Sequence, residues 1–307
     1  MKDNAIGLVN AKHGNFMFYN YDEFVGTSIR EYGEWSEKLL QKILLLINES
    51  DYVIDIGSHV GLMTIPIAKK IGDKGLVCSF EPQKMMYNLQ CGNLALNNIK
   101  NVEIFNAAMG KSSGVIFLDD IDYSEVGNFG GFGIKKDYDF SKFIKTTNRK
   151  KMRVKVKNLD QFLTLKKCNL IKLEAELLEK EILEGGIKFL EKFRPIVVAE
   201  NDPKNPYELN KYLMSKNYKL FWFEYRFFNQ NNYFINSNNH FKSSGKFYIF
   251  AFPREKKIEI NDMVEILKPD QINTNYNKNI NFYWKLLDGT PSPAQLELTN
   301  GVKIYTE

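Results

Sequence analysis

The chain has 307 residues, of which 44% are hydrophobic and 26% charged, and its formal net charge is only +5. These values are those of an ordinary globular protein whose mild charge selects no class of partner. Its three cysteines are widely separated, and its longest apolar run, around Ile43 to Ile47, is too short to cross a bilayer. We therefore expect no disulfide framework, no metal knuckle and no membrane span, and a cytoplasmic location.

Residues 1–50 are predicted to form an N-terminal lead-in. Their first 30 positions show weak periodicity, which is compatible with short strands. From Trp35 onward apolar residues recur at helical spacing, namely Leu39, Leu40, Ile43, Leu44 and Ile47. The pattern predicts a packing helix ahead of the first core strand.

The segment from Val53 to Ile67 is predicted to form a strand, a tight glycine turn and a helix. Asp55, Gly57 and Gly61 form a D-x-G-x-x-x-G motif, in which glycine lets the backbone bend and a ligand approach closely. A dinucleotide site usually has a further glycine where this chain has His59. The motif therefore favours an adenosine cofactor without phosphates, such as S-adenosylmethionine. The alternative is a turn that merely packs.

A second strand follows Gly75 and ends in Glu81, about 20 residues beyond the glycine turn. At this spacing an acidic side chain reaches the ribose hydroxyls of a bound nucleoside. Pro82 then begins the next helix. Ahead of the first strand, Tyr32 and Glu34 are expected to fold over the methionine end of the cofactor, although an ordinary helix entry explains them equally well.

The third apolar run, Val102 to Ala108, contains Asn106 near its end. We expect Asn106 to contact the adenine edge, unless it only forms a turn. Between two later strands, the glycine-rich segment from Gly127 to Gly133 is interpreted as a flap over the acceptor, with Asn128 and Gly131 as substrate-binding residues. A loose hairpin is the alternative interpretation.

Basic residues crowd between Lys145 and Lys157. They indicate either a contact for an anionic acceptor or nucleic acid, or the solvated outer face of a strand. We favour the solvated face.

Strands and helices alternate along the rest of the domain, which predicts an α/β fold with a doubly wound, mostly parallel sheet. Strands are expected at 170–174 and 195–200, with one helix through 178–190 between them. Two aromatic-rich strands at 218–225 and 246–252 are expected to form an antiparallel pair. Polar residues stand at or near five strand ends, where such sheets bind ligands: Asp55, Glu81, Asn106, Glu174 and Glu200.

The chain is thus divided into a lead-in (1–50), a cofactor-binding domain (51–255) and a C-terminal extension (256–307). The extension is rich in Asn and Lys with weak periodicity. It is expected to lie on the domain or to reach a partner, which includes a second copy of the chain.

From about Tyr32 to Pro253 the sequence resembles the FkbM-type S-adenosylmethionine-dependent methyltransferases. The resemblance rests, in order, on Val-Ile-Asp-Ile-Gly-Ser-His-Val-Gly, Ser-Phe-Glu-Pro, Asn-Ala-Ala, Asn-Leu-Asp, Ile-Lys-Leu-Glu-Ala-Glu and Ala-Glu-Asn. It implies a class I methyltransferase fold and O-methylation of a hydroxyl on a sugar or a secondary metabolite. With these motifs, Ser58 and Ala107 join the expected cofactor site and Asn201 joins the expected substrate site.

The chain departs from the family pattern at four positions, one of which is Ser58, where members typically have Ala. Family members typically have Asn at the position of His59, Asp at that of Glu174 and Gly at that of Leu177. If the family turn uses positive φ at the last position, a leucine there costs about 1–2 kcal/mol. Either the turn or the site has then changed.

Methylation of a hydroxyl needs alignment of the reacting atoms and a group that accepts the proton. Glu174, Glu176 and His59 are the candidate bases; Glu174 alternatively binds the cofactor ammonium, and His59 alternatively packs beside the turn. No cluster of residues has the spacing of a metal site. A Mg²⁺ ion bound by carboxylates is left open. Two other functions compete: an interaction protein that binds the cofactor without catalysis, and a nucleic-acid methyltransferase that uses the basic stretch.

Overall fold

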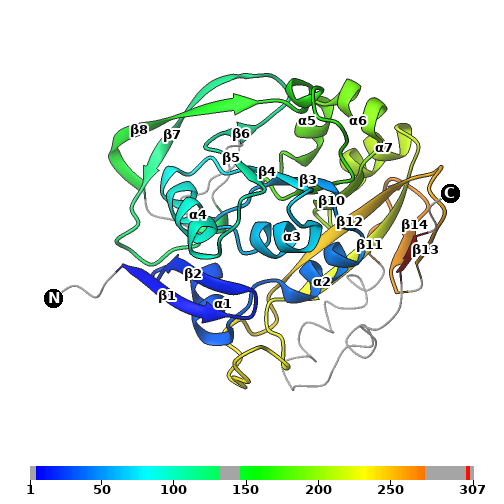
Figure 1. The fold of residues 1–307 in the computed structure, drawn as a ribbon. Helices are drawn as coiled ribbons and strands as arrows, with labels where there is room; N and C mark the ends of the chain where they lie inside the picture. The colour runs from blue at the N-terminus through cyan, green and yellow to red at the C-terminus, as the bar shows by residue number, and fades with distance from the viewer. Residues whose placement is uncertain (1–4, 132–145, 261, 274–301, 305–307) are drawn as a thin grey trace.

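The computed structural model describes residues 5–131, 146–260, 262–273 and 302–304, and it is built around one central sheet (Figure 1). In the described part of the chain this sheet has eight strands in the order β14-β11-β12-β10-β9-β3-β4-β5. Their bounds, in chain order, are β3 Tyr52–Ile56, β4 Leu76–Phe80, β5 Val102–Phe105, β9 Leu170–Leu173, β10 Ile196–Glu200, β11 Tyr218–Arg226, β12 Gly245–Pro253 and β14 Val264–Ile266.

The strands from β5 to β10 in this order are parallel, and β12 runs antiparallel to β10. The pair β11 and β12 is antiparallel, as predicted, and β12 lies between β10 and β11. Strands such as Ile196–Glu200 are almost continuously apolar because both faces of the sheet are covered. The predicted doubly wound sheet is therefore confirmed.

Helices cover both faces of the sheet. On one face α5 Glu179–Glu184, α6 Ile187–Phe193 and α7 Tyr207–Ser215 contribute buried side chains to one core cluster. On the other face, α2 Glu37–Leu45 and α3 Thr64–Ile71 pack on the strands. The single helix expected through 178–190 is wrong: Gly185 and Gly186 separate α5 from α6, because glycine is unfavourable inside a helix.

The N-terminal segment forms the hairpin β1 Ile6–Ala11 and β2 Gly14–Tyr19, followed by α1 Val25–Tyr32. The hairpin packs on α4 Lys84–Leu96 through Asn93, whose amide bonds both backbone groups of Met17 at 2.7 and 3.0 Å. Asn93 also donates to the carbonyl of Val60 at 2.9 Å. The hairpin is thus tied to the loop between β3 and α3.

A smaller sheet of β6 Ala108–Met109, β7 Gly114–Ile121 and β8 Thr146–Lys157 stands beside the main one (Figure 1). The strand expected to run to Ala108 instead ends at Phe105, and the chain then changes sheet. The basic stretch falls on β8, where Arg153 and Lys155 are exposed opposite Phe117 and Val115.

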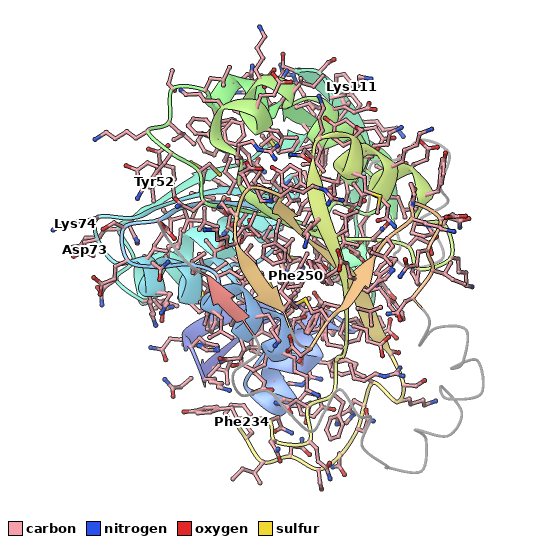
Figure 2. The ribbon with its side chains drawn as sticks, turned by 90° about the vertical axis from the view of Figure 1, so that its right-hand side faces the viewer. Tyr52, Asp73, Lys74, Lys111, Phe234 and Phe250 are labelled. Atoms are coloured by element: carbon pink, nitrogen blue, oxygen red, sulfur yellow. The ribbon has the colours of Figure 1, made fainter. Side chains whose placement is uncertain are left out.

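Two further features complete the described fold. The short strands β13 Ile258–Ile260 and β15 Val302–Ile304 pair with each other, whereas β14 extends the edge of the main sheet. Figure 2 shows Phe250 of β12 inside the molecule and Phe234 on the long β11–β12 loop at its lower end.

Candidate active site

A cavity of about 310 Å³ lies at the carboxyl ends of the parallel strands. From β3 the chain continues to β4 and β5 on one side and later to β9 and β10 on the other, so this edge is a topological switch point. The volume is at the lower end of the range of about 300–1,000 Å³ that is usual for small-molecule sites. The fold therefore places a ligand-sized cavity where doubly wound sheets bind their ligands.

The glycine turn after β3 lines this cavity and requires glycine at position 57. Gly57 has φ 76°, and a Cβ there would lie 1.9 Å from the carbonyl oxygen of Glu174. The N–H groups of Gly57 and Ser58 both donate to the carbonyl of Phe80, at 3.0 and 3.1 Å. Gly61, with φ 88°, directs the chain into α3 and lies outside the cavity lining.

Glu81, directly after β4, presents the carboxylate that the sequence assigns to a ribose. Its buried Oε1 accepts the N–H of Gln83 at 2.8 Å, and its Oε2 accepts the N–H of His59 at 2.9 Å. Burial raises the pKa of Glu81 to about 7, against the lowering effect of these two N–H groups. Each oxygen has a second lone pair, so the carboxylate can accept further hydrogen bonds from a ligand.

Pro82 and Ala107 line the cavity beside Glu81, whereas Asn106 is outside the lining. The amide nitrogen of Asn106 donates to the carbonyls of Glu81 and Pro82, at 2.9 and 3.1 Å. It therefore holds the loop after β4 in place.

Lys172, on β9, joins the glycine turn to the acidic residues around it. Its ammonium lies 3.3 Å from Asp55 Oδ1 and 3.2 Å from Glu174 Oε2, and it donates to the carbonyl of Gly57 at 2.8 Å. The other oxygen of Asp55 accepts the hydroxyl of Thr64 at 2.6 Å. Asp55 is fully buried, so it fixes Lys172 and the start of α3 from beneath the cavity.

Lys246, on β12, gathers three carboxylates at the opposite end of the cavity from Glu81. Its ammonium lies 2.5 Å from Glu174, 2.9 Å from Glu200 and 3.5 Å from Glu176. Although burial opposes ionisation, the two lysines hold the pKa of Glu174 well below its usual range. Burial raises the pKa of Glu200, and the neighbouring Glu176 adds to this effect while Lys246 opposes it. The cluster thus combines a firmly ionised carboxylate with one that gives up its proton less readily.

His59 also lines the cavity, with φ 52° in the glycine turn. Both ring nitrogens are buried without a hydrogen-bond partner among the described residues, and Nε2 lies 3.4 Å from Asp22 Oδ2. Burial lowers the pKa of His59 to about 4 and raises that of Asp22 to about 7. The ring is therefore neutral near pH 7, and in this conformation its nitrogens do not face the cavity space.

The turn after β9 has a left-handed backbone at two residues. Glu176 and Leu177 have φ 48° and 74°, and both line the cavity. Leucine at such a position costs about 1–2 kcal/mol relative to glycine. Leu177 therefore adopts the left-handed conformation that usually favours glycine, and it is 39% exposed.

Sequence reasoning missed several residues of the cavity lining. Phe24, Trp35 and Phe227 line it, with Trp35 stacked on Phe227 at 5.1 Å and Phe24 edge-on to Phe227 at 5.5 Å. Lys246 was missed as well. No local pattern marks these side chains as facing a ligand: Phe24 lies in the weakly periodic lead-in, and Trp35, Phe227 and Lys246 stand at or near the ends of predicted elements.

Three predicted site residues make other contacts. The hydroxyl of Tyr32 donates to the carbonyl of Asn238 at 2.7 Å, and Glu34 accepts hydrogen bonds from Asn229 and Tyr233. Both therefore hold the β11–β12 loop and lie outside the cavity lining. Asn201 is outside it too, and its amide donates to the side chain of Asn210 at 3.0 Å.

The first part of the expected flap is packed against the domain. Asn128 and Gly131 line the cavity, and Phe129 between them is fully buried. The carbonyl of Phe129 accepts the amide of Gln83 at 2.8 Å. The end of the expected flap, from residue 132, lies outside the described residues.

Within the described ranges, no group of three or more His, Cys, Asp or Glu side chains is arranged to hold a metal ion. The same ranges contain no helix that is long and apolar enough to span a membrane.

A family model, the methyltransferase FkbM domain, matches residues 55–233. Solved structures that are similar to this chain include the following three. The FkbM methyltransferase of Methylobacillus flagellatus KT shares 12% identity and a TM-score of 0.43, over 67% of this chain and 45% of that one. The M. jannaschii TYW2 structure in complex with AdoMet has 14% sequence identity and a TM-score of 0.42, over 82% of this chain and 87% of that one. A SAM-dependent methyltransferase from Aquifex aeolicus has 13% sequence identity and a TM-score of 0.38, over 74% of this chain and 93% of that one.

The chain spans less than half the length of the Methylobacillus protein. Comparison with curated proteins gave no match.

Proposed function

The chain belongs to the FkbM methyltransferase family, which uses S-adenosylmethionine, and we propose that it transfers the methyl group of this cofactor to a hydroxyl of a sugar, glycan or secondary metabolite. One observation carries the proposal: a single cavity connects Glu81, which suits a ribose, with a carboxylate cluster that suits a hydroxyl. The two groups stand on opposite sides of the switch point, as a donor and an acceptor would require.

The residues of the glycine turn fit the cofactor. Gly57 leaves no Cβ over the turn, and Glu81 retains lone pairs for two ribose hydroxyls. Pro82 and Ala107 supply apolar surface beside it for the adenine. The cofactor supplies an activated methyl group on a sulfonium, so the protein has mainly to align the acceptor and to accept its proton.

Glu176 is the best placed of the three candidate bases. Both oxygens of Glu174 are held by lysines, and the ring nitrogens of His59 are buried. Glu176 is 24% exposed in the cavity, and its closest described ion pair is 3.5 Å from Lys246. During methyl transfer to the acceptor hydroxyl, the Glu176 carboxylate would accept the hydroxyl proton.

Radiolabelled S-adenosylmethionine added to fractionated cell extract tests this function. We expect label in a fraction of hydroxyl compounds, and a loss of about 10²–10⁴-fold in the labelling rate for Glu176→Gln with unchanged cofactor affinity. Glu208→Gln, on the exposed start of α7, is the matched control. Label that enters only nucleic acid, or no label in any fraction, would contradict the proposal.

A further inference from the structure

The far end of the cavity has two chemically different walls, and this contrast constrains the acceptor. Its charged lining residues include Glu176, Glu200 and Lys246, here called the polar wall; Leu177 and the stacked pair Trp35 and Phe227 are apolar and are here called the apolar wall. Glu176 and Leu177 follow β9, Lys246 lies on β12, and Phe227, which stacks on Trp35, follows β11. In the sheet order these three strands lie on the side of β3 opposite to β4, which Glu81 follows. If the cofactor ribose is at Glu81, as the proposed function requires, these walls face the acceptor.

The apolar wall is built from side chains that the core leaves partly uncovered. Trp35 and Phe227 are half-buried, and Leu177 is 39% exposed. Large apolar side chains that border a cavity gain stability when a ligand covers them, in proportion to the area removed from water. A polyol with hydroxyls on every face would instead lose hydrogen bonds to water against this wall.

The polar wall disfavours anions. Its carboxylates, Glu174, Glu176 and Glu200, share the single ammonium of Lys246, while Lys172 is already engaged by Asp55 and Glu174. A phosphate or carboxylate brought to this wall would meet like charge at low dielectric. Carboxylate oxygens accept hydrogen bonds, so a neutral hydroxyl suits them.

We propose that the acceptor is an uncharged hydroxyl compound with an apolar face, which packs on Leu177, Trp35 and Phe227 while its hydroxyl meets Glu176. This inference rests on the proposed function and selects within it: hydroxyls on aromatic or hydrocarbon bodies, or on sugars that carry such groups, are favoured over free polyols and over phosphorylated sugars.

The test uses the full chain saturated with S-adenosylhomocysteine and matched probes. Phenyl and methyl β-D-glucoside, 1-naphthol and inositol, and glucose 6-phosphate are titrated by saturation-transfer NMR. We expect the apolar member of each pair to bind about tenfold more tightly or better, and glucose 6-phosphate to show no saturable binding. Leu177→Gly and Trp35→Ala should each reduce the preference at least threefold.

Ile235→Gly is the matched control for Leu177→Gly. Ile235 has φ 58° and is 88% exposed on the β11–β12 loop, outside the cavity lining. The substitution Ile235→Gly therefore relieves the same backbone conformation without changing the apolar wall. Equal binding within the pairs, tighter binding of the phosphate, or an unchanged preference in Leu177→Gly would overturn the inference. If the wild-type protein failed to bind S-adenosylhomocysteine, this result would instead overturn the proposed function.

Discussion

Removing the carboxylate of Glu81 should weaken the cofactor site more than any other single change in the β4 half of the cavity. In Glu81→Ala the N–H groups of His59 and Gln83 lose their acceptors, and a bound ribose loses two more. Glu81→Gln keeps one acceptor oxygen and should therefore lose less. Both changes leave the bonds of Gly57 and Ser58 to the carbonyl of Phe80 in place.

The magnitude follows from the ionisation state of the carboxylate. Burial raises the pKa of Glu81 to about 7, so we bracket the strength of its hydrogen bonds at pH 7 between that of neutral and that of charged ones. We expect a loss of about 1–3 kcal/mol in binding, or about 5- to 150-fold in Kd.

Isothermal titration calorimetry with S-adenosylhomocysteine and with NAD measures this effect directly. Glu103→Ala, exposed on the neighbouring strand β5, should keep wild-type affinity. Thermal unfolding of each variant separates a local loss from global unfolding. An unchanged affinity in Glu81→Ala, or tight binding of NAD by the wild type, would refute the assignment of Glu81 to the ribose.

Three further predictions concern stability. Glu174→Gln should lower the free energy of unfolding by about 3 kcal/mol in urea titrations, because the buried Lys172 and the partly buried Lys246 lose a counter-charge; a change below about 1 kcal/mol would show that they re-pair. Since burial raises the pKa of Asp22 to about 7, its contribution to stability is full below pH 4 and is lost as the pH rises through 7. Asp22→Asn should flatten this loss between about pH 4 and pH 7, and an unchanged pH profile would argue against it. Gln83→Ala removes the bond to the carbonyl of Phe129 and should speed limited proteolysis within residues 127–131 about fivefold; equal cutting rates would mean that packing alone holds this loop.

The sequence by itself determined the fold class, and it singled out Gly57 and Glu81, which both line the cavity. A glycine turn is visible in sequence because its backbone conformation, with φ 76° at Gly57, disfavours residues that carry a Cβ. The acid at the end of the next strand is equally local, since its distance from the turn is set by the length of one helix and one strand. Such requirements act within about 30 residues, where spacing is reliable.

Only the tertiary structure decided the end of the cavity around Lys246. Lys246 meets Glu174 and Glu200 because β12 inserts between β10 and β11 with Lys246 opposite Tyr225, and no local pattern specifies that register. Glu34 is expected from the sequence to fold over the methionine end of the cofactor, but it accepts hydrogen bonds from the β11–β12 loop instead. Side chains that converge from distant segments are fixed by strand order and packing, which depend on contacts along the whole chain.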